Sequence, residues 1–475
     1  VAIEPSDPAD MGALKKGLRQ LNRADPFVEV TVSARGEHVL AAAGEVHLER
    51  CVKDLKERFA KVSLEVSPPL VSYRETVQGE ALNPLDDLNG CCISEVVTAN
   101  GRCVVRVRVM KLPTPLTELL DKSCDLLGEI IGAKSKHAPK SLEEDGNQTE
   151  ALRKRMIDAV ENDLSSRASD IGSDRIEKCR ESWRSFFGRI WALGPGEVGP
   201  NILLTPPPPP PGSENSSNGS VLVNGRPYAS ERLGFCDNVD DTTCSSSTMG
   251  GDEMLLMKEA ESLESSVVSG FQLATSAGPL CDEPMWGLCF TVEANLSRDS
   301  ASPGDQYGGS LGGQVMTTVK EACRAAVLQN RPRIVEGFYF CELSTPTEYL
   351  GSTYAVLARR RARVLKEEMQ EGSALFCVNA YVPVAESFGF GDELRRWTSG
   401  ASSALLVFSH WGTLAEDPFF VPKTEEEIEE YGDGSNVPRN ISRKLIDAVR
   451  RRKGLAVEEK VVEHATKQRT RARKV

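Results

Sequence analysis

The sequence predicts an α+β protein in which one order of strands and helices occurs at both ends of the chain, around a different middle. Residues 1–68 and 332–413 each indicate strand, helix, strand, strand, helix, strand. Two helices on one face of a four-stranded sheet make a ferredoxin-like domain. Since 475 residues are enough for about three domains, this repetition indicates a modular protein.

The N-terminal pattern depends on two amphipathic helices and a hairpin. Each helix carries one apolar stripe at helical spacing, formed by Met11, Leu14, Leu18 and Leu21 in the first and by Leu48, Val52, Leu55 and Phe59 in the second. Residues 27–33 are rich in β-branched side chains and residues 38–43 follow a glycine turn, which predicts the hairpin. Residues 62–66 provide the last strand of this domain.

The C-terminal pattern alternates in the same way and ends in a charged segment. Strands are expected over residues 334–343, 363–368, 374–382 and 404–411, and helices over residues 349–357 and 390–399. Residues 414–475 then form an acidic linker and a basic helix. Residues 439–475 hold thirteen Lys and Arg against four Asp and Glu, a charge that suits contact with phosphate.

The middle of the chain, residues 69–331, is less regular. Residues 102–111 alternate apolar and basic side chains, as a half-exposed strand does. We expect three polar or proline-rich stretches, near residues 79–100, 132–180 and 205–260, to be insertions without regular structure. The six consecutive prolines that begin at Pro206 favour a spacer over a ligand for a partner domain.

Composition excludes several classes of protein. Hydrophobic residues make up 40% and charged residues 27% of the chain, and no apolar run approaches the ~18 residues of a membrane span. The thirteen cysteines include no C-x-x-C pair, and the five histidines do not cluster with them, so we expect no metal site and reduced thiols in a cytoplasmic protein. The chain begins at Val1 without a signal segment, as the middle of a longer protein would.

Motifs of nucleotide hydrolases and serine hydrolases are absent from the sequence. The chain contains neither G-x-x-x-x-G-K-[ST], which cradles phosphate, nor G-x-S-x-G. The glycine-rich residues 304–314 lack the lysine of a phosphate loop, and glycines suit a loop tip because they adopt positive φ without steric cost. We therefore expect no catalytic and no cofactor-binding residues in this chain.

Several stretches resemble translation elongation factor 2. Residues 36–51, GEHVLAAAGEVHLERC, resemble its domain III, and residues 71–77, VSYRETV, resemble the start of its domain IV. Further matches, in the same order, are residues 190–195, 199–203, 270–275, 280–287 and 381–390. The resemblance implies ferredoxin-like domains III and V that flank a ribosomal-protein-S5-like domain IV, on which the C-terminal helix packs. It also implies a G domain upstream of Val1, with GTP and magnesium as its cofactors.

One loop distinguishes between branches of this superfamily. In elongation factor 2 the matching loop is the tip of domain IV and carries a histidine that becomes diphthamide, whereas residues 295–313 contain no histidine here. The residues expected at the tip are Gly304, Asp305, Gln306, Tyr307, Gly308, Gly309, Gly312 and Gly313. The insertions and residues 450–470 resemble instead the elongation factor-like GTPases of cytoplasmic 60S subunit maturation. That family works with the Shwachman-Bodian-Diamond syndrome protein to release initiation factor six.

The resemblance also implies where the chain contacts its partners, the 60S subunit and its rRNA. Candidate rRNA contacts, chosen because arginine suits phosphate, are Arg359, Arg360, Arg361, Arg363, Lys366, Arg450, Arg451, Arg452 and Lys453. Tyr73, Arg74 and Glu75 mark the junction of domains III and IV as a candidate hinge, although a structural ion pair explains them equally well. We expect a monomer that binds no membrane.

Two other interpretations stay open at this point. A divergent elongation factor 2 paralogue that acts in translocation fits the superfamily, and the missing tip histidine opposes it. A truncated module that occupies the ribosome passively fits the missing G domain. The motifs favour the maturation factor.

Overall fold

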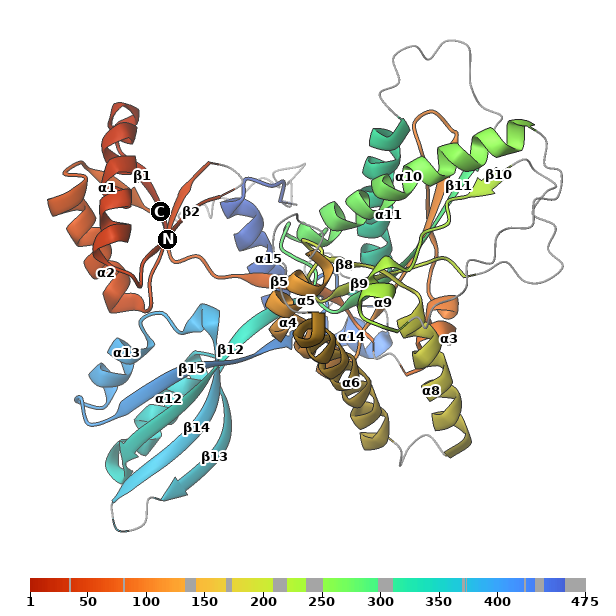
Figure 1. Cartoon of the computed structure of the whole chain (residues 1–475). Helices are drawn as coiled ribbons and strands as arrows, with labels where there is room; N and C mark the ends of the chain where they lie inside the picture. The colour runs from red at the N-terminus through yellow and green to blue at the C-terminus, as the bar shows by residue number, and fades with distance from the viewer. Residues whose placement is uncertain are drawn as a thin grey trace, which may run out of the picture. The chain divides into compact units, whose positions relative to one another are not determined.

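The structure, a computed structural model, forms two compact units (Figure 1). Unit 1 comprises Val1–Tyr73 and Val335–Thr413, and unit 2 comprises Arg74–Ile334 and Leu414–Val475. The residues that the structure describes are 1–33, 36–79, 82–132, 142–167, 173–207, 220–235, 251–297, 311–369, 372, 374–422, 424–431 and 440–457. No helix within these residues is both long and apolar enough to span a membrane.

The N-terminal part of unit 1 has the predicted ferredoxin-like fold. Its elements are β1 (Ala2–Pro5), η1 (Pro8–Asp10), α1 (Met11–Ala24), β2 (Glu29–Val32), β3 (His38–Ala41), α2 (Glu45–Asp54), the π-helical turn η2 (Leu55–Phe59) and β4 (Leu64–Val66). The strands pair antiparallel in the order β2-β3-β1-β4. The predicted stripes bury Leu14, Leu18 and Leu55 against Ile3 and Leu40 of the sheet. This core joins the two helices to one sheet.

A glycine allows these two helices to pack closely. A Cβ atom added to Gly17 of α1 would lie 2.8 Å from the Cβ of Ala60, which follows η2. Only glycine leaves room for such an approach, so the helix spacing depends on this residue.

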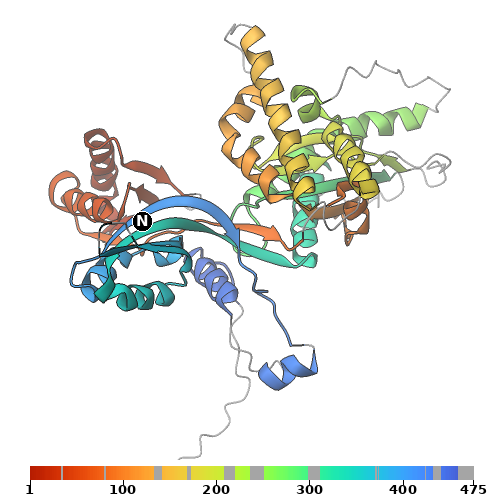
Figure 2. The same cartoon turned by 90° about the horizontal axis from the view of Figure 1, so that it is seen from below.

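The C-terminal part of unit 1 repeats the fold. Its elements are β12 (Pro332–Pro346), η4 (Thr347–Tyr349), α12 (Leu350–Arg359), β13 (Arg363–Met369), β14 (Leu375–Pro383), η5 (Val384–Glu386), α13 (Phe390–Trp397) and β15 (Ser403–Thr413). The strand order is β13-β14-β12-β15, and Figure 2 shows both helices on the same side of the sheet. Cys341, Val378, Val356 and Phe390 form its core. The predicted strands and helices are all present.

Unit 2 is built on a mixed sheet with helices on both faces. Its strands are β5 (Tyr73–Val77), β6 (Ser94–Val97), β7 (Cys103–Lys111), β8 (Ile190–Gly194), β9 (Asn201–Leu204), β10 (Ser220–Leu222) and β11 (Leu288–Ser297). Its helices are α3 (Pro84–Gly90), α4 (Thr114–Lys122), α5 (Cys124–Gly132), α6 (Leu142–Ser166), α8 (Ser173–Gly188), α9 (Tyr228–Arg232), α10 (Gly251–Ser276), α11 (Leu311–Gln329), α14 (Glu425–Tyr431) and α15 (Ile441–Arg452).

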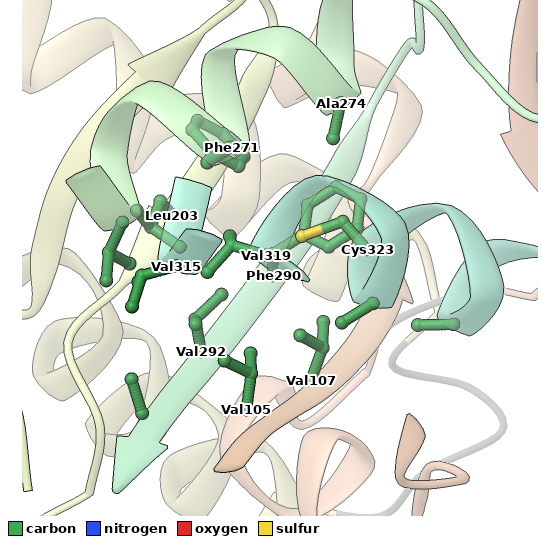
Figure 3. Packing of buried hydrophobic residues seen from close by; sticks show 14 of the residues in the cluster. Val105, Val107, Leu203, Phe271, Ala274, Phe290, Val292, Val315, Val319 and Cys323 are labelled. Carbon is green, nitrogen blue, oxygen red and sulfur yellow. The ribbon is translucent and has the colours of Figure 1, made fainter. Parts of the chain in front are cut away.

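The sheet of unit 2 has the order β6-β7-β11-β9-β8, with β10 paired to β11 and β5 paired to β12 outside it. Strands β9 and β11 pair in parallel, whereas β10 with β11, β11 with β7, β6 with β7 and β8 with β9 pair antiparallel. One face packs on α10 and α11 through Phe271, Phe290 and Val319 (Figure 3). The other face packs on α4, α6 and α8 through residues such as Leu204 and Phe186. Both faces are therefore buried, which explains the continuous apolar run of β9.

The expectation that the insertions lack regular structure is wrong for much of their length. Residues 79–100 contain α3 and β6, residues 132–180 contain all of α6 and part of α8, and residues 205–260 contain β10, α9 and the start of α10. The reason is visible in α6, where Leu152, Met156, Val160 and Leu164 are buried at helical spacing among charged neighbours. Prolines 208–211 of the proline run lie outside the described residues.

Candidate functional site

The predicted tip lies mostly outside the described residues, which resume at residue 311. This applies to Gly304, Asp305, Gln306, Tyr307, Gly308 and Gly309. Gly312 and Gly313 do not belong to the loop as predicted, because both lie in the first turn of α11. The buried face of helix α11 begins at Val315. The apolar stripe of this helix therefore predicts its start more accurately than the glycines do.

The arginines after α12 are largely occupied within unit 1. Arg360 donates to a carboxylate oxygen of Glu393 from Nε at 2.8 Å, and to the Glu386 carbonyl from Nη1 at 2.6 Å. The hydrogen bond from Arg360 lowers the pKa of Glu393. Arg359 donates to the same carboxylate at 3.2 Å, and its guanidinium carbon lies 4.2 Å from the Trp397 ring centroid. These contacts join α12 to α13.

Arg361 binds a buried carboxylate. Its Nη1 and Nη2 atoms donate to the two oxygens of Glu336 at 3.2 and 3.0 Å, and its Nε lies 3.5 Å from a Glu386 oxygen. Glu336 is only 1% exposed. Burial raises the pKa of Glu336, and the hydrogen bonds from Arg361 oppose that rise. Arg361 therefore has a structural role, whatever else it contacts.

Arg363 and Lys366 lie on β13, whose described residues are all exposed. Lys366 pairs with Glu368, two residues along the same strand. Arg359 is exposed as well, but it contacts Glu393 and the Trp397 ring. Arg363 and Lys366 are therefore the basic residues of this group best placed to reach an external phosphate.

The basic residues of the C-terminal helix α15 contact a loop that precedes β11 in unit 2. Arg450 donates from Nη1 to the Leu280 carbonyl at 2.6 Å. Lys453, which caps α15, donates to the carbonyls of Cys281 and Asp282 at 2.9 and 2.6 Å. The two cations thus bind three consecutive carbonyl oxygens of one loop.

Glu283 adds a carboxylate to this contact. Its Oε1 lies 2.8 Å from Nζ of Lys453 and 3.5 Å from Nη2 of Arg452, whereas Arg451 is exposed. Contact of any of these residues with rRNA stays a prediction. Their intramolecular partners give α15 a role in holding the loop.

The same loop binds a buried carboxylate on its other side. Glu75, fully buried in β5, accepts hydrogen bonds from the backbone N–H groups of Leu280 at 2.7 Å, Cys281 at 2.9 Å and Glu283 at 3.2 Å. A Cβ atom added to Gly278 would lie 2.4 Å from this carboxyl group. This role of Glu75 was not predicted from the sequence, where Glu75 lies between Arg74 and Thr76 without a local signal of burial.

The stability of unit 2 should depend on pH through Glu75. Burial raises the pKa of its carboxyl, although the backbone N–H donors oppose the rise. The folded state therefore keeps the proton to higher pH than the unfolded state, whose pKa is about 4.3. We expect the difference in unfolding free energy between wild type and Glu75→Gln to fall as pH rises above that value. Urea denaturation at several pH values measures it, and parallel curves for the two proteins would contradict the expectation.

The predicted hinge residues differ in their surroundings. Tyr73 is 5% exposed, and Arg74 donates from Nη1 to Asp121 of α4 at 2.9 Å. The division into two compact units falls between Tyr73 and Arg74. Arg74 therefore forms the structural ion pair that was the alternative to a hinge. Motion at this junction stays a prediction.

One histidine does cluster with a cysteine, contrary to the sequence analysis. Ligand atoms of Asp25, His47 and Cys51 all lie within 4.8 Å of one another. The separation of four residues in α2 between His47 and Cys51 was the available signal. His47 Nδ1 accepts the Ala43 N–H at 3.3 Å, so Nε2 carries the proton and donates to Asp25 at 2.6 Å. In that tautomer Nε2 offers a proton, and no lone pair, to the space between the three side chains. The arrangement fits a histidine that is held by hydrogen bonds in the first turn of α2.

Comparison with known families explains this arrangement of domains. The Elongation Factor G, domain III model matches residues 1–68, and the Elongation factor G C-terminus model matches residues 333–420. Between them, the Elongation factor-like GTPase 1-like domain model matches residues 108–206. The chain belongs to the elongation factor G superfamily. The predicted resemblance and the two ferredoxin-like domains are confirmed.

The chain is similar over nearly its whole length to three longer proteins. Elongation factor-like GTPase 1 of Homo sapiens is 34% identical over 99% of this chain and 44% of its own length. Ribosome assembly protein 1 of Saccharomyces cerevisiae is 35% identical over 99% of this chain and 38% of its own length. The Schizosaccharomyces pombe protein of the same name is 34% identical over 99% and 43%. The chain spans less than half the length of these relatives.

The Elongation factor-like GTPase 1-like domain match at residues 108–206 includes α6 and α8. The stretch predicted as an insertion relative to elongation factor 2, residues 132–180, therefore lies in a region that resembles proteins of the elongation factor-like GTPase 1 type.

Proposed function

We propose that this chain is the ribosome-binding C-terminal part of a translational-type GTPase that matures the large ribosomal subunit. The observation that carries the proposal is similarity over 99% of the chain to proteins named elongation factor-like GTPase 1 and ribosome assembly protein 1. The elongation factor-like GTPase 1-like match at residues 108–206 supports the same branch. GTP and magnesium would act in a G domain, for which the unmatched length of the relatives leaves room.

The substrate of this activity would be a late cytoplasmic pre-60S subunit that carries the anti-association initiation factor six. In this proposal the GTPase acts with the Shwachman-Bodian-Diamond syndrome protein, and domains III to V transmit a nucleotide-dependent movement to the tip of domain IV. The chain itself contacts and transmits, and bond cleavage takes place in the G domain. Rotation at Tyr73 and Arg74, where the compact units divide, would supply the movement.

Gradient sedimentation of the full-length protein tests the proposal. We expect the protein to sediment with free 60S subunits, and its depletion to leave initiation factor six on them. Sedimentation with 80S ribosomes and polysomes, without retention of that factor, would instead indicate a translocation factor and overturn the proposal. Sedimentation with 60S subunits but no retention of the factor would indicate passive binding.

Charge reversal on β13 should weaken binding to the 60S subunit. Arg363→Glu combined with Lys366→Glu replaces two exposed cations, and phosphate contacts dominate affinity for RNA. We expect affinity to fall about tenfold and the slope of log affinity against log salt to become shallower by about two. Fluorescence anisotropy of labelled protein on purified 60S subunits, over a salt series, measures both quantities.

The matched control for this experiment is Lys15→Glu with Lys16→Glu, which makes the same charge change on exposed residues of α1. If both double variants weaken binding equally, the effect is one of net charge. The assignment of Arg363 and Lys366 as rRNA contacts would then be lost.

A further inference from the structure

Helices α6 and α8, labelled in Figure 1, border a cavity that the function proposed above does not use. The cavity has a volume of about 370 Å³, and its wall on α6 runs from Arg153 to Leu164. At a rise of about 1.5 Å per residue, this wall is roughly 17 Å long. It is therefore long enough for about three turns of a bound helix, and the cavity has room for one or two large side chains.

The cavity has an apolar floor and a basic rim. Ile157, Val160 and Leu164 line it at helical spacing along α6. The basic rim consists of Arg153, Arg180 and Arg184, against a single lining carboxylate, Glu161. The charged lining is thus predominantly positive, which favours an anionic ligand with an apolar anchor.

The arginines of the rim have hydrogen-bonding capacity to spare. Arg180 donates from Nη1 to Glu177 at 3.2 Å, in a pair whose side chains are 39% and 60% exposed. Its Nε is buried without a hydrogen-bond partner among the described residues. Exposed ion pairs are weak, so a carboxylate of a ligand can replace Glu177 at little cost. Arg184 is exposed.

The aromatic residues of the cavity argue against a nucleic acid base as the ligand. Trp183 and Phe187 are each only 3% exposed. The rings of Phe187 and Phe235 stack at 4.8 Å, and Arg153 lies over the Phe235 ring with its guanidinium carbon 5.8 Å from the centroid. Bases bind single-strand sites by stacking on free aromatic faces. Aliphatic side chains, by contrast, fit the floor beside Ile157.

We propose that the cavity between α6 and α8 is a docking site for an acidic peptide segment of a partner protein, anchored by one or two aliphatic side chains. The carboxylates of that segment pair with Arg153, Arg180 and Arg184. All lining residues except Phe235 lie within the elongation factor-like GTPase 1-like domain at residues 108–206, so the partner would be particular to that branch. This inference does not depend on the release of initiation factor six.

Fluorescence anisotropy with a defined probe tests the site in the full chain. The probe is a dye-labelled, end-capped peptide of fourteen residues, with two leucines four residues apart among glutamates and alanines. We expect saturable binding that weakens about tenfold in Arg153→Glu combined with Arg184→Glu. The matched control, Arg155→Glu with Lys178→Glu, changes exposed residues of α6 and α8 outside the cavity lining and should alter affinity less than about twofold.

Further probes and variants define the results that overturn the proposal. A peptide with serines in place of the leucines should bind about tenfold more weakly. Equal affinity of the two peptides would show that binding rests on nonspecific charge attraction alone and would overturn the proposal. A 12-nucleotide oligouridylate that binds more tightly than the peptide, with the same sensitivity to charge reversal, would identify an RNA site instead. Circular dichroism and thermal melting verify folding, and Arg184→Glu alone serves if the double variant does not fold.

The chain itself offers one competing ligand. Residues 236–250 follow Phe235 along the chain, lie outside the described residues and include Asp237, Asp240 and Asp241. If replacing these three aspartates by asparagine tightens peptide binding about tenfold, the site belongs to this segment and the proposal of a partner protein fails. Unchanged affinity supports the proposal.

Discussion

Replacement of Glu75 by alanine is expected to destabilise unit 2 by about 3 kcal/mol or more. The variant leaves three buried backbone N–H groups, those of Leu280, Cys281 and Glu283, without an acceptor. Each unsatisfied buried donor costs about 1–3 kcal/mol. The loop they belong to also carries the contacts with Arg450 and Lys453, so α15 should detach with it.

Urea denaturation followed by tryptophan fluorescence measures the effect, since Trp286 is 2% exposed and its backbone N–H donates to the Glu75 carbonyl. Glu75→Gln should lose less stability than Glu75→Ala, because one amide oxygen still accepts two of the N–H groups. Glu177→Ala, an exposed carboxylate of α8, is the matched control. A loss of less than about 0.5 kcal/mol in Glu75→Ala would show that the loop does not depend on this carboxylate.

Replacement of Arg361 by alanine is expected to destabilise the C-terminal domain of unit 1 by about 3–5 kcal/mol, because it leaves Glu336 buried without a cation. Arg361 has a φ of 52°. Alanine keeps the Cβ atom, so the backbone strain is unchanged and the loss reports on the ion pair. Thermal unfolding followed by circular dichroism measures it.

A double-mutant cycle separates this ion pair from other effects. Arg361→Ala combined with Glu336→Ala should be less destabilised than the sum of the two single variants, since the double variant removes both charges and leaves no buried charge unpaired. Arg363→Ala, on the exposed strand β13, is the control and should melt within about 0.5 kcal/mol of wild type. If Arg361→Ala melts like Arg363→Ala, the structural role assigned to Arg361 is wrong and its predicted rRNA contact regains weight.

Only part of the candidate site could be predicted from the sequence. A run of arginines at residues 359–363 identifies a basic segment, but it does not distinguish cations that hold the fold from cations that face solvent. The partners decide this: Glu393 lies 33 residues from Arg360, and Glu336 precedes Arg361 by 25. Ion pairs between residues so far apart along the chain leave no local pattern from which they could be predicted.

Local patterns determined the two ferredoxin-like domains, because a helix stripe at spacing of three and four residues and β-branched strands are properties of neighbouring residues. They also determined the superfamily, through motifs such as residues 36–51. Helices α6 and α8 were not predicted, although the apolar stripe of α6 is a local pattern; its burial against the sheet of unit 2 depends on the tertiary structure.

Tertiary structure alone decided the binding of loop 280–283 by Glu75 on one side and by α15 on the other. Residues 75, 280 and 450 are far apart along the chain, and each looks ordinary among its neighbours. A buried carboxylate is tolerated only where donors converge on it, and that convergence exists only once the strands and the C-terminal helix have assembled.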